Sequence, residues 1–317
     1  MTWSVVGGSG FIGGAVLTSL RAAGEAARPV AAPRVASSAR TPGEIAAEAD
    51  RHSDVVEALA RELAGSTVVV NAAGAASPKS PASPELTGAN ALLPVLVARA
   101  CAAAGVRRLV HLSSAAVQGH RPVLDESPET EPFSPYSRSK ALGEESLALL
   151  SSGALEVVSV RATSVQGAAR PTTAALARLA ASPLASVASP GTAPSPLTSV
   201  DALAELVRQV GLHDGPMPAI VLQPWEGMTV RSVLEATGGT PLVLPAPLCR
   251  LILRAGYGVS ALLRERLHGS IRRVELMWFG QDQIAGWTAE QRITLPARVS
   301  SILEEAGARR RGPRRAP

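Results

Sequence analysis

The chain has 317 residues, of which 46% are hydrophobic, enough for one large α/β domain or a large domain with a smaller appendage. The formal net charge of +5 equals the charge of the five arginines in the last residues, GARRRGPRRAP, so the rest of the chain is formally neutral. This pattern excludes a basic body of the kind that binds nucleic acid, and we expect no nucleic-acid partner. Residues 307–317 are predicted to form a basic disordered tail; the alternative is a contact with an acidic partner or with lipid.

Several features bear on the compartment of the protein. Cys101 and Cys249 lie in apolar surroundings, which is typical of buried, reduced thiols in a cytoplasmic protein. The N-terminus shows no signal segment in which basic residues precede apolar ones. The apolar segment 242–263 is interrupted by arginines and prolines, so it predicts a buried or amphipathic helix and no membrane partner. The five histidines show no ligand spacing, so no metal site is predicted.

In chain order, strand and helix patterns alternate through about residue 165. The first 24 residues read as a strand, a glycine turn and a helix. Further strands are predicted at 28–34, 66–74, 106–119 and 155–163, with helices at 89–105 and 134–150. Such alternation predicts an α/β fold, a Rossmann-type doubly wound parallel sheet over residues 1–165. Residues 166–306 are richer in Pro, Ser and Gly and predict a smaller, mixed, substrate-binding part that can interleave with the first.

The glycines of the first turn have a spacing that suits a nucleotide. Gly7, Gly10 and Gly13 form G-x-x-G-x-x-G between the first strand and the first helix. Such a turn lets backbone N–H groups approach a pyrophosphate at a helix N-terminus. A dinucleotide site is therefore predicted, and a purely structural turn is the alternative.

The residue type after the second strand distinguishes NAD from NADP. An acidic residue there would bind the ribose hydroxyls of NAD, whereas this chain has Arg34, followed by Arg40. Because an arginine suits a 2′-phosphate, we expect NADP as the preferred cofactor, with NAD as the alternative. A solvated surface arginine is the alternative reading of Arg34.

The segment YSRSK places Tyr136 and Lys140 four residues apart. On a helix this spacing puts both side chains on one face. An ammonium beside a phenol brings the pKa of the phenol closer to neutrality and so suits it to acid–base chemistry.

These motifs together resemble the extended short-chain dehydrogenase/reductase family, also called the NAD-dependent epimerase/dehydratase family. The matching segments are GGSGFIG (7–13), NAAG (71–74), Asn90, HLSSAAVQG (111–119) and YSRSK (136–140). They occur in the order and at the separations usual in that family and cover about residues 3–165.

The resemblance implies roles for individual residues. Tyr136 would exchange a proton with the substrate oxygen, and Lys140 would lower the pKa of the phenol and bond the nicotinamide ribose. Ser114 would orient the same oxygen, with Ser113 as its stand-in. Asn90 is either a cofactor-binding residue or a helix cap. With Arg34, the predicted cofactor-binding residues are Gly7, Gly10, Phe11, Ile12, Gly13, Ala72, Ala73, Gly74, Asn90, Tyr136 and Lys140.

The chain also departs from the family pattern. Gln118 stands where many members have a tyrosine, and Ala162 and Gln166 replace the proline and tyrosine that usually follow the strand after the catalytic helix. We expect these changes to alter the substrate wall. Where sugar-nucleotide members often have an arginine that contacts pyrophosphate, this chain has Ser195–Leu197, which weakens a sugar-nucleotide assignment; Arg231 or another arginine is the candidate substitute.

The resemblance predicts an NAD(P)-dependent oxidoreductase acting on a small-molecule substrate. The expected reaction is reduction of a carbonyl on a medium-sized substrate, for which the 4-keto group of a nucleotide-activated deoxysugar is a candidate. A sugar-nucleotide epimerase that retains NAD is the alternative, and dehydration is disfavoured because SSAAVQG has no carboxylate. A cofactor-sensing or scaffold protein is the non-enzyme alternative. A homodimer is common in the family, although the sequence itself carries no signal for it.

Overall fold

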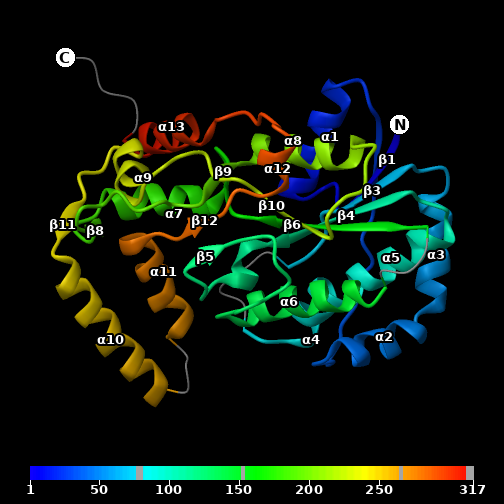
Figure 1. The fold of residues 1–317 in the computed structure, drawn as a ribbon, viewed down its shortest axis with the longest axis horizontal. Helices are drawn as coiled ribbons and strands as arrows, with labels where there is room; N and C mark the ends of the chain where they lie inside the picture. The colour runs from blue at the N-terminus through cyan, green and yellow to red at the C-terminus, as the bar shows by residue number, and fades with distance from the viewer. Residues whose placement is uncertain (76–80, 151–153, 264–266, 312–317) are drawn as a thin grey trace.

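A computed structural model describes residues 1–75, 81–150, 154–263 and 267–311. Its centre is a six-stranded parallel sheet in the order β10-β6-β4-β3-β1-β2 (Figure 1). The strands are β1 Thr2–Val6, β2 Ala26–Val30, β3 Val68–Asn71, β4 Arg108–Ser114, β6 Glu156–Ala162 and β10 Ile220–Leu222. The predicted α/β fold with a Rossmann-type parallel sheet is confirmed.

Helices cover both faces of this sheet. On one face, α1 (Phe11–Ala22) and α8 (Val200–Leu212) pack over the apolar side chains of the central strands. On the other face lie α2 (Pro42–Asp50), α3 (Ser53–Leu63), α5 (Leu93–Ala103) and α6 (Pro135–Ala148). The strand order reverses between β1 and β3, and in open α/β sheets ligands bind at the carboxyl ends of the strands at such a point.

Two expectations about individual elements need correction. The second strand ends at Val30, before Arg34, and includes Pro29, which the sheet tolerates because β2 is an edge strand. The helix predicted at 89–105 starts at Pro84, as α4 (Pro84–Thr87), and continues through the π-helical turn η1 (Gly88–Leu92) into α5. This stretch, Pro84–Ala103, is the one described helix long and apolar enough to cross a membrane, but 72% of its apolar window is buried in the protein.

The C-terminal residues form a smaller mixed part and also complete the sheet, since β10 and α8 both follow residue 166. Six short strands outside the main sheet pair as β7–β9, β8–β11 and β5–β12, so the N-terminal strand β5 pairs with the C-terminal strand β12. They are β5 Val123–Leu124, β7 Ser164–Gln166, β8 Ser186–Ala188, β9 Leu197–Ser199, β11 Leu242–Leu244 and β12 Asp282–Gln283. The remaining helices are η2 Ala115–Gln118, α7 Pro171–Ala180, α9 Val230–Ala236, α10 Ala246–Leu262, α11 His268–Phe279, α12 Trp287–Glu290 and α13 Val299–Arg311.

Two C-terminal expectations are also revised. Helix α13 continues to Arg311, five residues into the segment predicted to be a disordered tail; 312–317 lie outside the described residues. Within segment 242–263, Leu242–Leu244 form strand β11 and Ala246–Leu262 form the amphipathic helix α10, which has an exposed apolar side. Helices α10 and α11 extend away from the sheet as a pair (Figure 1).

Candidate functional site

The glycine turn joins the carboxyl end of β1 to α1. Gly7 has a φ of +79°, and a Cβ on it would lie 2.7 Å from the backbone nitrogen of Ala73. A Cβ on Gly13 would lie 2.3 Å from the carbonyl oxygen of Gly7. Gly10 is the N-cap of α1 and supplies no side-chain cap. The first N–H groups of the helix, including those of Phe11 and Ile12, are therefore available to an anion at the positive end of the helix dipole.

Ser114 and Tyr136 meet although 22 residues separate them. Ser114 is the last residue of β4, and its hydroxyl accepts a hydrogen bond of 3.2 Å from the Ala116 backbone. Tyr136 is the second residue of α6, and Ser114 is close enough to lower the pKa of its phenol. Ser113 points away, since its hydroxyl donates to the Glu144 carboxylate. The structure thus favours Ser114 over Ser113 as the partner of Tyr136.

Lys140 is buried, and its position relates it to the loop after β3. Its Nζ donates to the Leu112 carbonyl over 2.9 Å, and a Cβ on Gly74 would lie 3.2 Å from that Nζ. Burial lowers the pKa of Lys140 to about 8, and the Glu144 carboxylate opposes this shift. Lys140 therefore borders the loop that was predicted to approach the cofactor.

The electrostatic prediction for Tyr136 is wrong for this structure. Its pKa is raised, because burial outweighs the opposing effects of Ser114 and of the nearby charge of Arg170. Arg170, rather than Lys140, is the cation that lowers the pKa of the phenol here. Its guanidinium also lies 5.1 Å from the centre of the Phe11 ring and donates to the Val165 carbonyl. Arg170 could not be found from the sequence, because a single arginine in a loop has no spacing to interpret.

Asn71 and His111 form a buried polar pair beneath the site. Asn71 Oδ1 accepts a 3.2 Å hydrogen bond from the Ala73 backbone, and its Nδ2 lies 3.3 Å from Nδ1 of His111. Burial and the charge of Lys140 hold the pKa of His111 well below its usual value, so its ring is neutral. These contacts fix the chain where Ala72 and Ala73 leave the sheet.

Asn90 lies inside η1 and is fully buried, so the helix-cap alternative is wrong. Its Nδ2 donates to the Ala75 carbonyl and the Ser139 hydroxyl, over 3.2 and 2.9 Å, and its Oδ1 accepts from the Ala75 backbone. A Cβ on Gly74 would lie 2.9 Å from that Oδ1. Asn90 therefore ties the loop after β3 to helix α6.

A buried ion pair links helix α6 to strand β6 and to the loop after Ser114, here called the serine loop. Arg161, fully buried in β6, bonds the Glu144 carboxylate through Nε and Nη2, with a shortest distance of 2.8 Å. Its Nη1 donates to the carbonyls of Asp125 and Ser127. The i,i+4 spacing of Lys140 and Glu144 was the signal in the sequence that could have drawn attention to this carboxylate.

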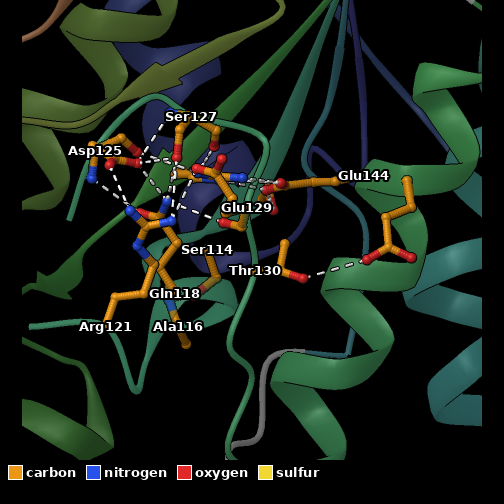
Figure 2. Close-up of polar contacts among 12 residues, drawn as sticks. Ser114, Ala116, Gln118, Arg121, Asp125, Ser127, Glu129, Thr130 and Glu144 are labelled. Atoms are coloured by element: carbon orange, nitrogen blue, oxygen red, sulfur yellow. Dashed lines mark hydrogen bonds and ion pairs between the residues drawn. The ribbon is translucent and has the colours of Figure 1, made fainter. Parts of the chain in front are cut away.

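The loop that follows Ser114 is held by its own polar side chains, as Figure 2 shows. Gln118 is fully buried and donates from Nε2 to Asp125, Ser127 and the Glu129 carbonyl. Arg121 pairs with Asp125 and Glu129 at 3.0 Å each. The Gln118 side chain therefore holds the loop together, and at 0% exposure it does not itself reach a substrate.

Three further residues that the sequence analysis singled out lie outside the group formed by Ser114, Tyr136 and Lys140. Arg34 is exposed and lines a cavity of about 570 Å³ together with Ala73 and Gly74. Gln166 is buried and accepts from Thr173 at 2.9 Å. Arg231 pairs with Glu235 on α9 at 2.7 Å and is half exposed. Of the two arginines considered for ligand contacts, Arg34 and not Arg231 borders the loop after β3.

The NAD dependent epimerase/dehydratase family model matches residues 3–208. The chain belongs to this family. Among the residues that the structure describes, no group of His, Cys, Asp and Glu could hold a metal. No curated protein matches the chain significantly.

Solved structures of other proteins share the fold. A human epimerase family protein, SDR39U1 isoform 2 with NADPH, has a TM-score of 0.66 and 18% identity, with 97% of this chain and 99% of that chain covered. UDP-glucuronic acid 4-epimerase from Bacillus cereus, with UDP-glucuronic acid and NAD, has a TM-score of 0.64 and 16% identity over 97% and 98% of the two chains. A dTDP-4-dehydrorhamnose reductase from Clostridium acetobutylicum has a TM-score of 0.55 and 18% identity over 77% and 83%.

Proposed function

We propose that this family member is an NAD(P)H-dependent reductase of a carbonyl on a medium-sized substrate. The 4-keto group of a nucleotide-activated deoxysugar is the substrate that we favour. The observation that carries the proposal is the convergence of Ser114, Tyr136 and a buried Lys140, whose Nζ lies beside the loop after β3, with a glycine turn that has no room for side chains. Loss of the tyrosine or the lysine would be expected of a non-catalytic relative, and this chain keeps both.

The residues of the turn fit a dinucleotide. Gly7 and Gly13 have no room for a side chain, and α1 presents N–H groups that no side chain caps. In the proposal, these N–H groups bind the pyrophosphate and Lys140 bonds the nicotinamide ribose. The bound nicotinamide supplies the hydride.

The side chains of the chain supply positioning and the proton. Ser114 would donate a hydrogen bond to the substrate carbonyl oxygen and hold it close to the phenol of Tyr136. Tyr136 would give its proton to that oxygen as negative charge develops. A raised pKa keeps the phenol protonated at neutral pH, which suits a proton donor in a reduction. Arg170 would stabilise the phenolate left after the transfer, since its charge acts on the same oxygen.

NADP is the cofactor that we propose, with Arg34 as the partner of its 2′-phosphate. Arg34 has no ion pair or hydrogen bond within the described part of the chain, and it borders the cavity at the loop after β3. No acidic residue occurs between Val30 and Gly43 to bind ribose hydroxyls instead.

A sugar-nucleotide epimerase that retains NAD is the second candidate. It is supported by the likeness along nearly the whole chain to the Bacillus cereus epimerase, whose structure contains NAD. Reductase and epimerase use the same three side chains, so the fate of the cofactor separates them. A reductase exchanges its cofactor at every turnover, and an epimerase keeps it.

The test is to denature the freshly purified protein and to identify the released nucleotide by mass spectrometry. We expect a protein that releases no stoichiometric nucleotide and then binds NADPH, as measured by quenching of tryptophan fluorescence. Stoichiometric NAD would replace the proposal by the epimerase. Absence of affinity for NADPH and NADH would favour a scaffold role.

A further inference from the structure

Exposed apolar side chains cluster in residues 242–267, a segment that we call the arm. Of the fourteen large hydrophobic residues that are exposed in the described chain, nine lie between residues 242 and 267. Within this segment, Leu262 is 85% exposed and Leu251 is 63% exposed. Single exposed hydrophobics need no explanation, but a contiguous group of them marks an interaction surface.

Helix α10 arranges these side chains as a stripe. We call this stripe the α10 face, and its residues recur every three or four positions, as expected for one side of a helix. A different side of α10 carries the buried residues Cys249, Leu253 and Ser260, two of which pack in a cluster with residues of α11. The exposed stripe therefore lies away from that packing. Its members are Leu248, Leu251, Ile252, Ala255, Val259 and Leu262.

The charged residues of α10 itself, Ala246–Leu262, are both arginines. Residues 236–264 contain three arginines and no aspartate or glutamate. Arg250 and Arg254 are exposed on α10 itself, outside the α10 face. Neither forms an ion pair in the residues that the structure describes, although Arg250 lies 5.4 Å from the Phe279 ring centre.

We propose that the α10 face docks the protein onto an anionic lipid surface. A helix with an apolar stripe on one side and arginines, without carboxylates, on its polar side has the composition of helices that lie in the plane of a membrane interface. The headgroups of anionic lipids would pair with Arg250 and Arg254 while the leucines enter the acyl boundary. A second copy of the chain fits less well, because its α10 offers arginines and no carboxylate to pair with them. The exposed helix and the distant glycine turn lie on different parts of the fold (Figure 1), so docking leaves the cofactor site free.

The test is co-sedimentation of the full-length protein with vesicles of phosphatidylcholine and phosphatidylglycerol, with pure phosphatidylcholine vesicles in parallel. We expect sedimentation with the anionic vesicles that weakens as salt is raised. The double variant Leu251→Glu, Leu262→Glu should bind at least about tenfold more weakly, because two leucines that would enter the acyl boundary are lost. The matched control is Leu184→Glu, Ile284→Glu, which changes the charge equally at exposed hydrophobics outside the arm and should bind like the parent.

Circular dichroism and thermal unfolding establish that each variant is folded. Sedimentation measures binding directly and does not depend on catalysis. Equal sedimentation of the two double variants would overturn the proposal. So would a parent protein that ignores anionic vesicles, or a dimer in light scattering that only the α10 variant disrupts. A variant with the five C-terminal arginines changed to glutamine separates the tail: if it alone loses binding, the tail and not α10 is the contact.

Discussion

Gly143 in α6 packs against the backbone carbonyl of Asn90 so closely that a Cβ on residue 143 would lie 2.2 Å from the oxygen. Helix α6 carries Tyr136 and Lys140, and η1 carries Asn90. The absent side chain therefore sets the spacing between the helix of the proposed acid and the turn that holds the loop after β3. A π-helical turn is often found at functional sites, and here it presents the Asn90 amide to Ala75 and Ser139.

We expect Gly143→Ala to separate these two elements. The added methyl group has no space, so the free energy of unfolding should fall by about 1–3 kcal/mol and turnover should fall with it. Gly258→Ala is the control, since that glycine lies in α10 with nothing within 4 Å of its Cβ position, and the change should be neutral or stabilising by about 0.5–1 kcal/mol. Urea denaturation measures both. Equal stability of the two variants would show that the close approach is not tight.

Tyr136→Phe removes the proposed proton donor. Turnover should fall by at least roughly 10²–10⁴-fold, while the affinity for NADPH changes little. The other tyrosine provides the control: Tyr257 bonds Glu275 at 2.6 Å far along the chain, and Tyr257→Phe should keep its activity. Steady-state kinetics and a cofactor titration decide the matter, and a fully active Tyr136→Phe enzyme would refute the assignment.

Arg34→Ala should weaken NADPH binding by about 10–100-fold and leave NADH binding nearly unchanged, because a charge-assisted hydrogen bond to the 2′-phosphate is lost. Arg40→Ala is the matched control. Arg40 is also exposed, but it lines a different cavity beside Glu44. Titration calorimetry with both nucleotides gives two affinities for each variant. Equal losses for NADPH and NADH would remove the phosphate contact from the proposal.

The depressed pKa of Lys140 makes the stability of the protein depend on pH. The folded-state value is about 8 against 10.5 for an ordinary lysine, so between these values the unfolded chain binds more protons and stability rises with pH. Lys140→Met removes this dependence. We expect the free energy of unfolding of the parent to rise, relative to that of the variant, by at most about 3 kcal/mol between pH 8 and 10.5. Urea denaturation without cofactor measures both proteins. A constant difference between the two proteins across this window would mean that the burial of the charge has no such cost.

The sequence predicted those parts of the fold whose pattern is local. The apolar runs at β1, β3, β4 and β6 and the glycine turn between β1 and α1 carry their own signals, and the alternation of strands and helices indicates the parallel sheet. Strand β10 has only three residues, which is too short for a period to be read, so the completion of the sheet by the C-terminal part could not be placed. The π-helical turn at Asn90 was missed for a similar reason, because one extra residue in a helix leaves the apolar pattern nearly intact.

The site shows the same division. Tyr136 and Lys140 are found from a spacing of four residues, and Ser114 follows from a family resemblance. Arg170 is different, since only the tertiary fold places the loop that carries it close to Tyr136. The burial of the Gln118 side chain depends in the same way on its hydrogen-bond partners further along the loop. Side chains that act through long-range contacts leave no pattern in a single sequence.

The buried pair of Arg161 and Glu144 gives the last prediction. Arg161→Met should lower the free energy of unfolding by about 3–5 kcal/mol, because it leaves the Glu144 carboxylate buried without its partner. The double variant with Glu144→Met should be less destabilised than the sum of the single changes, with a coupling of about 0.5–3 kcal/mol. A cycle on the partly exposed pair of Arg208 and Glu205 is the control and should give at most about 1 kcal/mol. Additive effects at Arg161 and Glu144 would show that the pair does not act as a unit in holding β6, α6 and the serine loop together.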